Sequence, residues 1–332
     1  MSITKDSGIA LNGGRRPLLE VRDLTMRYTT RAGEVSAVDS VSFSVERGQA
    51  LGLVGESGCG KSSIAITLLN LLPENASIVE GEILIDGIDI APMSEEEMLE
   101  YRWARVSMVF QAAMNSLDPV YRVGDQIVEA LEHHVESARE ESLERVRELY
   151  DLVSLDHSFI PRYPHEYSGG MKQRAIIAMA LACEPDLIIA DEPTTALDVI
   201  VQDHILREMK KVQRELDMGM IYISHDMAVI AEVSDVVGVM YAGKIVEFGD
   251  AQGTFEDPIH PYTRALMSAF PSVTGEKHEL ATLGGEPPNL LDPPSGCRFH
   301  PRCPYATDEC FTQEPPIVRR GERWAACWNP PE

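Results

Sequence analysis

One run of the sequence has the residue types and spacing that suit phosphate binding. Residues 55–62 read Gly-Glu-Ser-Gly-Cys-Gly-Lys-Ser, which fits the pattern G-x-x-x-x-G-K-S between an apolar run at 50–54 and a helix-like stretch at 62–72. The glycines let the backbone curl so that N–H groups face phosphates, and the start of the helix adds partial positive charge. We expect Lys61 to bridge the β- and γ-phosphates and Ser62 to bind Mg²⁺. An unliganded glycine-rich turn is the alternative. The predicted ATP-binding residues of this stretch are Gly55, Ser57, Gly58, Cys59, Gly60, Lys61, Ser62 and Ser63.

Two adjacent carboxylates follow a second apolar run. Residues 187–190 read Leu-Ile-Ile-Ala and lead directly into Asp191 and Glu192. Open α/β sheets present their ligands at the carboxyl ends of strands, so this pair is predicted to lie near the phosphates. Asp191 is expected to hold Mg²⁺, largely through water, and Glu192 to act as the general base that polarises the attacking water. A helix cap and turn with no catalytic role is the alternative.

Apolar periodicity indicates which elements must position these groups. Alternating segments within 18–45 predict an antiparallel sheet. Residues 115–172, rich in Glu, Arg and Leu, predict an inserted helical subdomain. The runs 187–190 and 220–223, with a helix at 199–216 between them, predict buried parallel strands and an α/β core. The apolar residues with helical spacing in the insertion are Ile127, Leu131, Val135, Leu143, Val146 and Leu149.

The amino-acid composition of the chain changes after Phe270. Proline, glycine and isolated cysteines dominate, and the Pro-Pro pairs are typical of loops rather than regular elements. We therefore predict a nucleotide-binding domain at 18–270 and a C-terminal extension at 271–332.

Composition and charge exclude some classes of function. The 332 residues carry a formal net charge of −24, which would repel nucleic-acid phosphate. No apolar run approaches the roughly 20 residues that span a bilayer. The first 16 residues lack the apolar core of a secretory signal, so a cytoplasmic location is expected.

A third motif narrows the choice of protein family. Residues 167–174 read Tyr-Ser-Gly-Gly-Met-Lys-Gln-Arg and resemble the signature sequence of ABC ATPases. Gln111, Asp198 and His225 stand beside it in the family's order. The resemblance implies a P-loop NTPase core of ABC type, with an N-terminal antiparallel β subdomain, an inserted helical subdomain and a cysteine-containing C-terminal extension.

The resemblance also implies roles for individual residues. Two such domains meet head to tail, and each ATP lies between one subunit's phosphate loop and the other's signature. His225 would contact the γ-phosphate, Gln111 would sense the nucleotide and join the Mg²⁺ ligands, and Asp198 would cross the dimer interface. Tyr28 would stack on adenine, unless it is an ordinary sheet residue. The signature residues that would face the partner's γ-phosphate are Ser168, Gly169 and Gly170.

Four of the six cysteines fall in the C-terminal extension. Disulfides are rare in a reducing cytosol, so a metal or iron–sulfur site is the better interpretation, and four thiolates suit either Zn²⁺ or a 4Fe-4S cluster. Residues 296–304 and 260–263 resemble the C-terminal extension of oligopeptide/dipeptide importer ATPases, some of which carry an iron–sulfur cluster. We expect a 4Fe-4S cluster, with zinc or unmetallated thiols as alternatives. The predicted ligands are Cys297, Cys303, Cys310 and Cys327.

Together these observations predict the ATP-hydrolysing motor subunit of an ABC importer for di- or oligopeptides. The implied partners are a second homologous ATPase, forming a heterodimer, two transmembrane permease subunits and an extracytoplasmic substrate-binding protein. The chain would lie at the cytoplasmic face of the membrane. Nickel or oligosaccharide cargo, a soluble ABC ATPase of DNA repair or translation, and a non-hydrolysing subunit are the alternatives.

Overall fold

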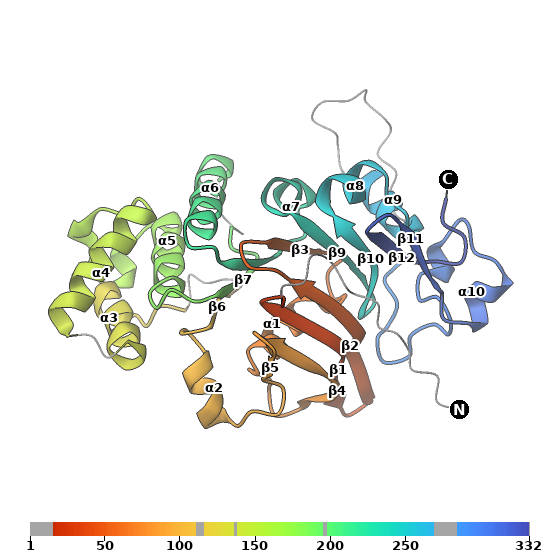
Figure 1. Cartoon of the computed structure of the whole chain (residues 1–332), viewed down its shortest axis with the longest axis horizontal. Coiled ribbons are helices and arrows are strands. Elements are labelled where there is room, and N and C mark those ends of the chain that lie inside the picture. Colours follow the sequence, from red (N-terminus) through yellow and green to blue (C-terminus); the bar gives the residue numbers. More distant parts are fainter. Residues whose placement is uncertain (1–15, 111–115, 136–137, 195–197, 269–283, 332) are drawn as a thin grey trace. The chain divides into compact units, whose positions relative to one another are not determined.

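The protein is described here by a computed structural model (Figure 1) that covers residues 16–110, 116–135, 138–194, 198–268 and 284–331. Contacts divide these residues into two compact units. The first contains the described parts of 1–45, 50–91 and 223–332, and the second contains 46–49 and 92–222.

The first unit opens with an antiparallel sheet, as the alternation within 18–45 predicts. Its strand order is β2-β1-β4-β5. Leu19 on β1 pairs with Val45 on β2 and with Ile85 on β4, and all three side chains are buried. The strands are β1 (Leu19–Thr30), β2 (Gly33–Val45), β4 (Ala76–Ile85) and β5 (Ile88–Asp89).

A second group of strands in the same unit carries the phosphate-binding run. β3 is buried at all five residues and pairs in parallel with β9, with Leu51 opposite Val236. β9 pairs antiparallel with β10, β10 with β12, and β12 with β11. The strands are β3 (Ala50–Val54), β9 (Val236–Tyr241), β10 (Lys244–Asp250), β11 (Ile317–Arg320) and β12 (Arg323–Ala326).

Short helices complete the first unit. They are α1 (Lys61–Leu68), α7 (Met227–Val233), α8 (Ala251–Glu256), α9 (Pro261–Ser268), α10 (Asp308–Thr312) and the 3₁₀ turn His300–Arg302. Glu247 on β10, which is fully buried, accepts hydrogen bonds from the N–H groups of Ile259 and His260 at 2.8 Å each, just before α9 begins. A buried carboxylate with two such donors fixes the start of that helix.

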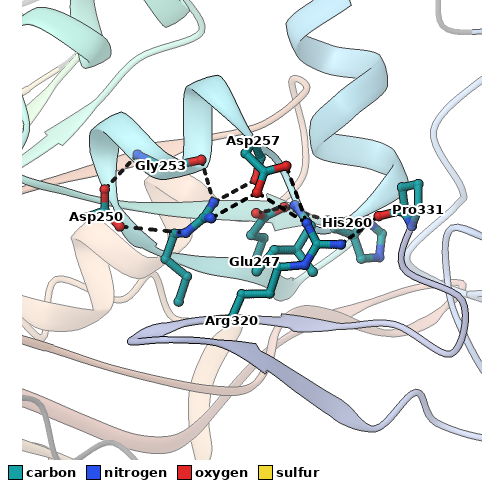
Figure 2. A network of polar contacts seen from close by, with 9 residues as sticks. Glu247, Asp250, Gly253, Asp257, His260, Arg320 and Pro331 are labelled. Carbon is teal, nitrogen blue, oxygen red and sulfur yellow. Dashed lines mark hydrogen bonds and ion pairs between the residues drawn. The ribbon is translucent and has the colours of Figure 1, made fainter.

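The C-terminal extension forms regular structure, contrary to the expectation of loops alone. Its β11–β12 hairpin adds two strands beside β10, and a polar network attaches it to α8 (Figure 2). Arg323 donates to the carbonyls of Gly253 and Asp257 and pairs with the Asp257 carboxylate at 3.2 Å. Arg320 pairs with the same carboxylate and donates to the carbonyl of Pro331 at 2.7 Å. The described part of the extension therefore belongs to the first compact unit.

The second unit contains parallel strands and most of the longer helices. β6 and β7 pair in parallel, with Val106 opposite Leu187. Helices α3, α4 and α5 pack on one another around the predicted apolar residues, because Ile127, Leu131 and Val146 are all buried. The strands are β6 (Val106–Val109), β7 (Leu187–Asp191) and β8 (Gly219–Ile223). The helices are α2 (Glu95–Tyr101), α3 (Val123–His134), α4 (Arg139–Leu152), α5 (Gly169–Ala180) and α6 (Val199–Glu215), with 3₁₀ turns at His157–Phe159 and Pro164–Glu166.

Candidate functional site

The glycine-rich run forms the turn between β3 and α1 that phosphate binding requires. Gly60 caps α1 in a left-handed conformation with φ of +110°. Lys61 is 7% exposed, and its Nζ donates to the carbonyls of Gly55 at 2.7 Å and Glu56 at 3.1 Å. Ser62 is exposed in the first turn of α1, where the helix carries partial positive charge. The loop therefore places an ammonium group and a hydroxyl at the start of a helix, which suits a polyanion with a divalent cation.

Neighbouring elements of the first unit fix this loop. Cys59 is 4% exposed, and its carbonyl accepts a hydrogen bond from the N–H of Gly243 at 2.8 Å. Burial raises the pKa of the Cys59 thiol, so it stays neutral near pH 7 and fills space within the loop. Tyr28 on β1 lies beside the loop, with its hydroxyl 3.4 Å from the Ser63 hydroxyl. The tyrosine predicted to stack on adenine is therefore adjacent to the phosphate loop.

His225 belongs to the same unit as the phosphate loop. It is exposed and lies two residues after the end of β8. The residue between them, Ser224, donates its N–H to the carbonyl of Leu53 on β3 at 3.4 Å. Asp226 then caps α7 by accepting from the N–H groups of Ala228 and Val229. The exposed imidazole thus sits at the carboxyl end of a strand, within reach of solvent.

The acidic pair ends a fully buried strand in the second unit. Asp191 is the last residue of β7 and is 3% exposed. Glu192 has φ of +48°, a left-handed conformation that costs a residue with a side chain about 1–2 kcal/mol. Such strain is concentrated at functional sites, because only a well-supported turn retains it. Asp191 therefore ends a buried strand, and Glu192 follows it in a left-handed backbone conformation.

The signature run forms the start of α5. The Ser168 side chain caps the helix by accepting from the N–H of Met171 at 3.3 Å, and Gly169 and Gly170 are its first two residues. Ser168 and Gly169 are exposed. An exposed helix start with a hydroxyl and two side-chain-free amides is a second anion-binding surface, available to a ligand held elsewhere.

Tyr167, the residue before Ser168, holds the start of α5 in place. It is 5% exposed, and its hydroxyl donates to the carbonyl of Phe159 at 2.6 Å while accepting from the Tyr150 hydroxyl at 2.8 Å. Burial raises the pKa of Tyr167 to about 12, which keeps the hydroxyl protonated and able to donate.

Replacing Tyr167 by phenylalanine should lower the free energy of unfolding by about 2 kcal/mol, because two buried polar groups lose their partner. The matched control is Tyr150→Phe, which removes only one of the two hydrogen bonds and should cost about 1 kcal/mol. Urea unfolding of both variants measures the difference. Equal losses would contradict the bridging role of the Tyr167 hydroxyl.

Of two further predicted site residues, the structure describes Asp198 but not Gln111. Asp198 caps α6 by accepting from the N–H of Val201 at 3.0 Å, and the next two side chains, Val199 and Ile200, are 79% and 83% exposed. Gln111 lies outside the described residues, so its predicted role stays a prediction.

The four cysteines of the extension gather in one place. They line a small pocket together with His260 and His300. Burial raises the pKa of Cys297 to about 11 and that of Cys327 to about 12, and the other thiols nearby add to the effect. Among the residues that the structure describes, no group of three or more His, Cys, Asp or Glu side chains is arranged to hold a metal ion. The predicted ligands are thus close together, but among the described residues their side chains are not arranged as a metal site.

Sequence reasoning missed the residues that support the phosphate loop from the C-terminal side. Glu56 occupies a variable position of the loop pattern, yet its N–H donates to the Tyr262 hydroxyl at 2.9 Å and its carboxylate contacts Arg302. A carboxylate inside a phosphate-binding loop is electrostatically unfavourable without a cation. The glutamate at position 56 was therefore the feature of the sequence that could have pointed to a nearby cation.

Similarity to known proteins covers most of the chain. Residues 38–195 match the family described as ABC transporter, and residues 246–310 match the family described as oligopeptide/dipeptide transporter, C-terminal region. The oligopeptide transport ATP-binding protein OppD of Escherichia coli (strain K12) is 43% identical over 317 residues, covering 95% of this chain and 94% of that protein. The dipeptide transport ATP-binding protein DppD of Bacillus subtilis (strain 168) is 42% identical over 315 residues, covering 94% of each.

Solved structures show the same fold. The structure described as a dimeric, post-hydrolysis state of an ATP-binding cassette bound to ADP and Pi has a TM-score of 0.64 and 26% identity. The similarity covers 70% of this chain and 98% of that one.

Proposed function

Because this chain belongs to the ABC transporter ATP-binding subunits of the oligopeptide/dipeptide importer family, we propose that it powers peptide uptake by hydrolysing ATP at a site shared with a second ATPase. The P-loop fold of ABC type and the ATPase activity predicted from the sequence are confirmed. Assignment of individual residues to steps of the reaction is our proposal.

We assign the nucleotide site as follows. Lys61 neutralises the β- and γ-phosphates, Ser62 and Asp191 hold Mg²⁺, and Glu192 accepts a proton from the attacking water. The buried ammonium of Lys61 at the start of α1 and the rigid strand end under Asp191 support these roles. His225 fixes the geometry of the γ-phosphate and water. Gln111 would complete the Mg²⁺ ligands.

We infer that each site is completed by the signature turn of the other ATPase. The exposed cap of α5, with Ser168 at its tip, offers an anion-binding surface without enclosing a ligand of its own. Exposed apolar side chains beside Asp198, namely Val199 and Ile200, are typical of a surface that becomes covered. ATP bound between two such faces would hold the two ATPases together, and hydrolysis would allow them to separate.

Peptide import requires partners in the membrane. Among the described residues, no helix is both long enough and apolar enough to span a bilayer. We propose that two permease subunits form the path, that a homologous ATPase completes a heterodimer, and that an extracytoplasmic binding protein delivers the peptide. The chain would then act at the cytoplasmic face of the membrane. A DNA-repair or translation role is not favoured, since a net charge of −24 repels nucleic acid.

The observation that carries this proposal is that one chain matches both the ABC transporter family, over residues 38–195, and the C-terminal region of oligopeptide/dipeptide transporters, over residues 246–310. Affinity purification of the tagged chain from detergent-solubilised membranes tests it. We expect two permease subunits and a second ATPase to co-purify, and peptide added with the binding protein to stimulate ATP hydrolysis. Recovery of ribosomes or DNA with the chain, in place of membrane subunits, would overturn it.

We also propose that the four cysteines bind a 4Fe-4S cluster, with zinc as the alternative. Support comes from the pocket that the four side chains share. Burial raises the pKa of Cys297 and Cys327, the neighbouring thiols add to the effect, and a cation between the thiolates would offset it. Binding would require the side chains to rearrange, because none of the described groups has the arrangement of a metal site. Iron, sulfide and zinc analysis of anaerobically purified protein decides between the two, and protein free of all three contradicts both.

A further inference from the structure

The phosphate loop is in direct contact with the C-terminal extension through one ion pair. The Arg302 guanidinium contacts both carboxylate oxygens of Glu56, at 2.6 Å and 3.0 Å, although 246 residues separate the two positions. The Arg302 side chain is 5% exposed and that of Glu56 is 25% exposed. Two parallel N–H···O bonds of this kind fix both the distance and the orientation of the carboxylate.

The arginine is itself held in one conformation. Its guanidinium lies 5.8 Å from the centre of the Tyr241 ring, and its Nε donates to the carbonyl of Gly284 at 2.9 Å. The Tyr241 ring packs in turn against Phe299 and Tyr262, with ring centroids 5.2 Å and 4.6 Å away. Arg302 therefore reaches Glu56 from a rigid aromatic support.

The backbone of Glu56 is fixed on both sides as well. Its N–H donates to the Tyr262 hydroxyl at 2.9 Å, and its carbonyl accepts from the Lys61 ammonium at 3.1 Å. Glu56 thus connects Arg302 to the lysine that is assigned to the phosphates.

A second contact supports the middle of the loop. Arg298, whose side chain is 10% exposed, donates to the carbonyl of Ala242 and pairs with Asp39. The next residue, Gly243, donates its N–H to the carbonyl of Cys59 in the loop. Residues 298–302 of the extension therefore reach the phosphate loop by two routes.

The negative charge of Glu56 makes the binding of a polyanionic ligand depend on the ion pair with Arg302. A carboxylate in the loop repels a triphosphate, and the repulsion is strong where solvent screening is weak. Arg302 cancels that charge and holds the carboxylate in place. Without it, the loop would carry an uncompensated negative charge next to its ligand.

We propose that Arg302 is a positioning residue for nucleotide binding, through which the C-terminal extension sets the affinity of the phosphate loop for the triphosphate. The inference rests on the proposed binding of MgATP by that loop. It gives the family's C-terminal region a direct role at the ATP site of its own subunit, in addition to whatever its cysteines bind.

Titration of the full chain with a fluorescent trinitrophenyl derivative of ATP, in the presence of Mg²⁺, tests the inference. Arg302→Ala should raise the Kd about 10-fold, because the loop loses its support and retains the charge of Glu56. Glu56→Gln in the same background should restore the Kd to within about threefold of wild type, since the repelling charge is gone. The matched control is Arg320→Ala, which removes an arginine of the extension that contacts Asp257 on α8's C-terminal side and should leave the Kd unchanged.

Thermal unfolding of each variant separates affinity from folding. If Arg302→Ala does not fold, Arg302→Lys carries the test: it keeps the charge but loses the two-point contact, and should raise the Kd about threefold. A wild-type Kd in Arg302→Ala, or no recovery when Glu56→Gln is added to a folded Arg302→Ala, overturns the inference. Failure of the wild-type chain to bind the probe would instead overturn the proposed ATP site.

Discussion

Replacing Glu192 by glutamine should leave MgATP binding intact and lower the rate of ATP hydrolysis by about 10²- to 10⁴-fold. Glutamine has nearly the same shape and can occupy the same left-handed backbone position, but its amide cannot accept a proton from the attacking water. The carboxylate of Asp191 and the ammonium of Lys61 remain, so the nucleotide should stay bound. Phosphate release from the assembled transporter measures turnover, and retention of labelled ATP measures binding.

The chain offers a matched control for this substitution. Glu184 also has a left-handed backbone, with φ of +51°, and its side chain pairs with Arg145 rather than with any proposed catalytic group. Glu184→Gln should leave turnover within about twofold of wild type, because a partly exposed ion pair contributes little to stability. Wild-type hydrolysis in Glu192→Gln, or an equal loss in both variants, would refute the assignment of the general base.

Replacing Gly60 by alanine should weaken nucleotide binding by about 100-fold or more, which corresponds to roughly 2.7 kcal/mol. A Cβ atom at this position would lie 2.2 Å from the carbonyl oxygen of Ala37, and φ is +110°. Neither the carbonyl nor the helix start can move far, since Ala37 lies within β2. The loop and the first turn of α1 must therefore shift away from the geometry that binds phosphate.

Gly58→Ala distinguishes the effect of the steric clash from the effect of replacing a glycine that has positive φ. Gly58 also has a positive φ, +79°, but nothing lies within 4 Å of the Cβ that would be added. Only backbone strain of about 1–2 kcal/mol is expected there, so affinity should fall about tenfold. Titration with MgATP, with circular dichroism to verify folding, compares the two. A similar loss in both variants would show that the contact with Ala37 is unimportant.

Local pattern was sufficient to predict the elements around the site. The strand expected at 187–190 appears as β7 (Leu187–Asp191), and the helix expected at 199–216 appears as α6 (Val199–Glu215). Buried strands and their flanking turns are encoded by neighbouring residues, so the apolar runs identify them. The periodicity was less reliable at helix ends. Val135, expected on the buried face, ends α3 and is 52% exposed.

The C-terminal extension was harder to interpret because its order depends on distant partners. The hairpin of β11 and β12 turns at Gly321, with φ of +65°, between a pair formed by Arg320 and Arg323. A two-residue turn that starts with glycine is a hairpin signal, but the surrounding proline pairs favoured loops. The contact of Arg302 with Glu56 joins residues far apart in sequence, and no local spacing encodes it.

The hairpin also changes what the first unit presents to other molecules. β10 would otherwise leave its backbone donors and acceptors available on the side that β12 covers, where Phe248 faces Trp324 and Glu247 faces Ala325. The outermost strand is now β11, only four residues long, preceded by two prolines and carrying two arginines. Short, charged and proline-flanked strands resist strand addition. Growth of this sheet from copy to copy is therefore blocked at that side, which helps keep a subunit that must pair with others from aggregating before it does so.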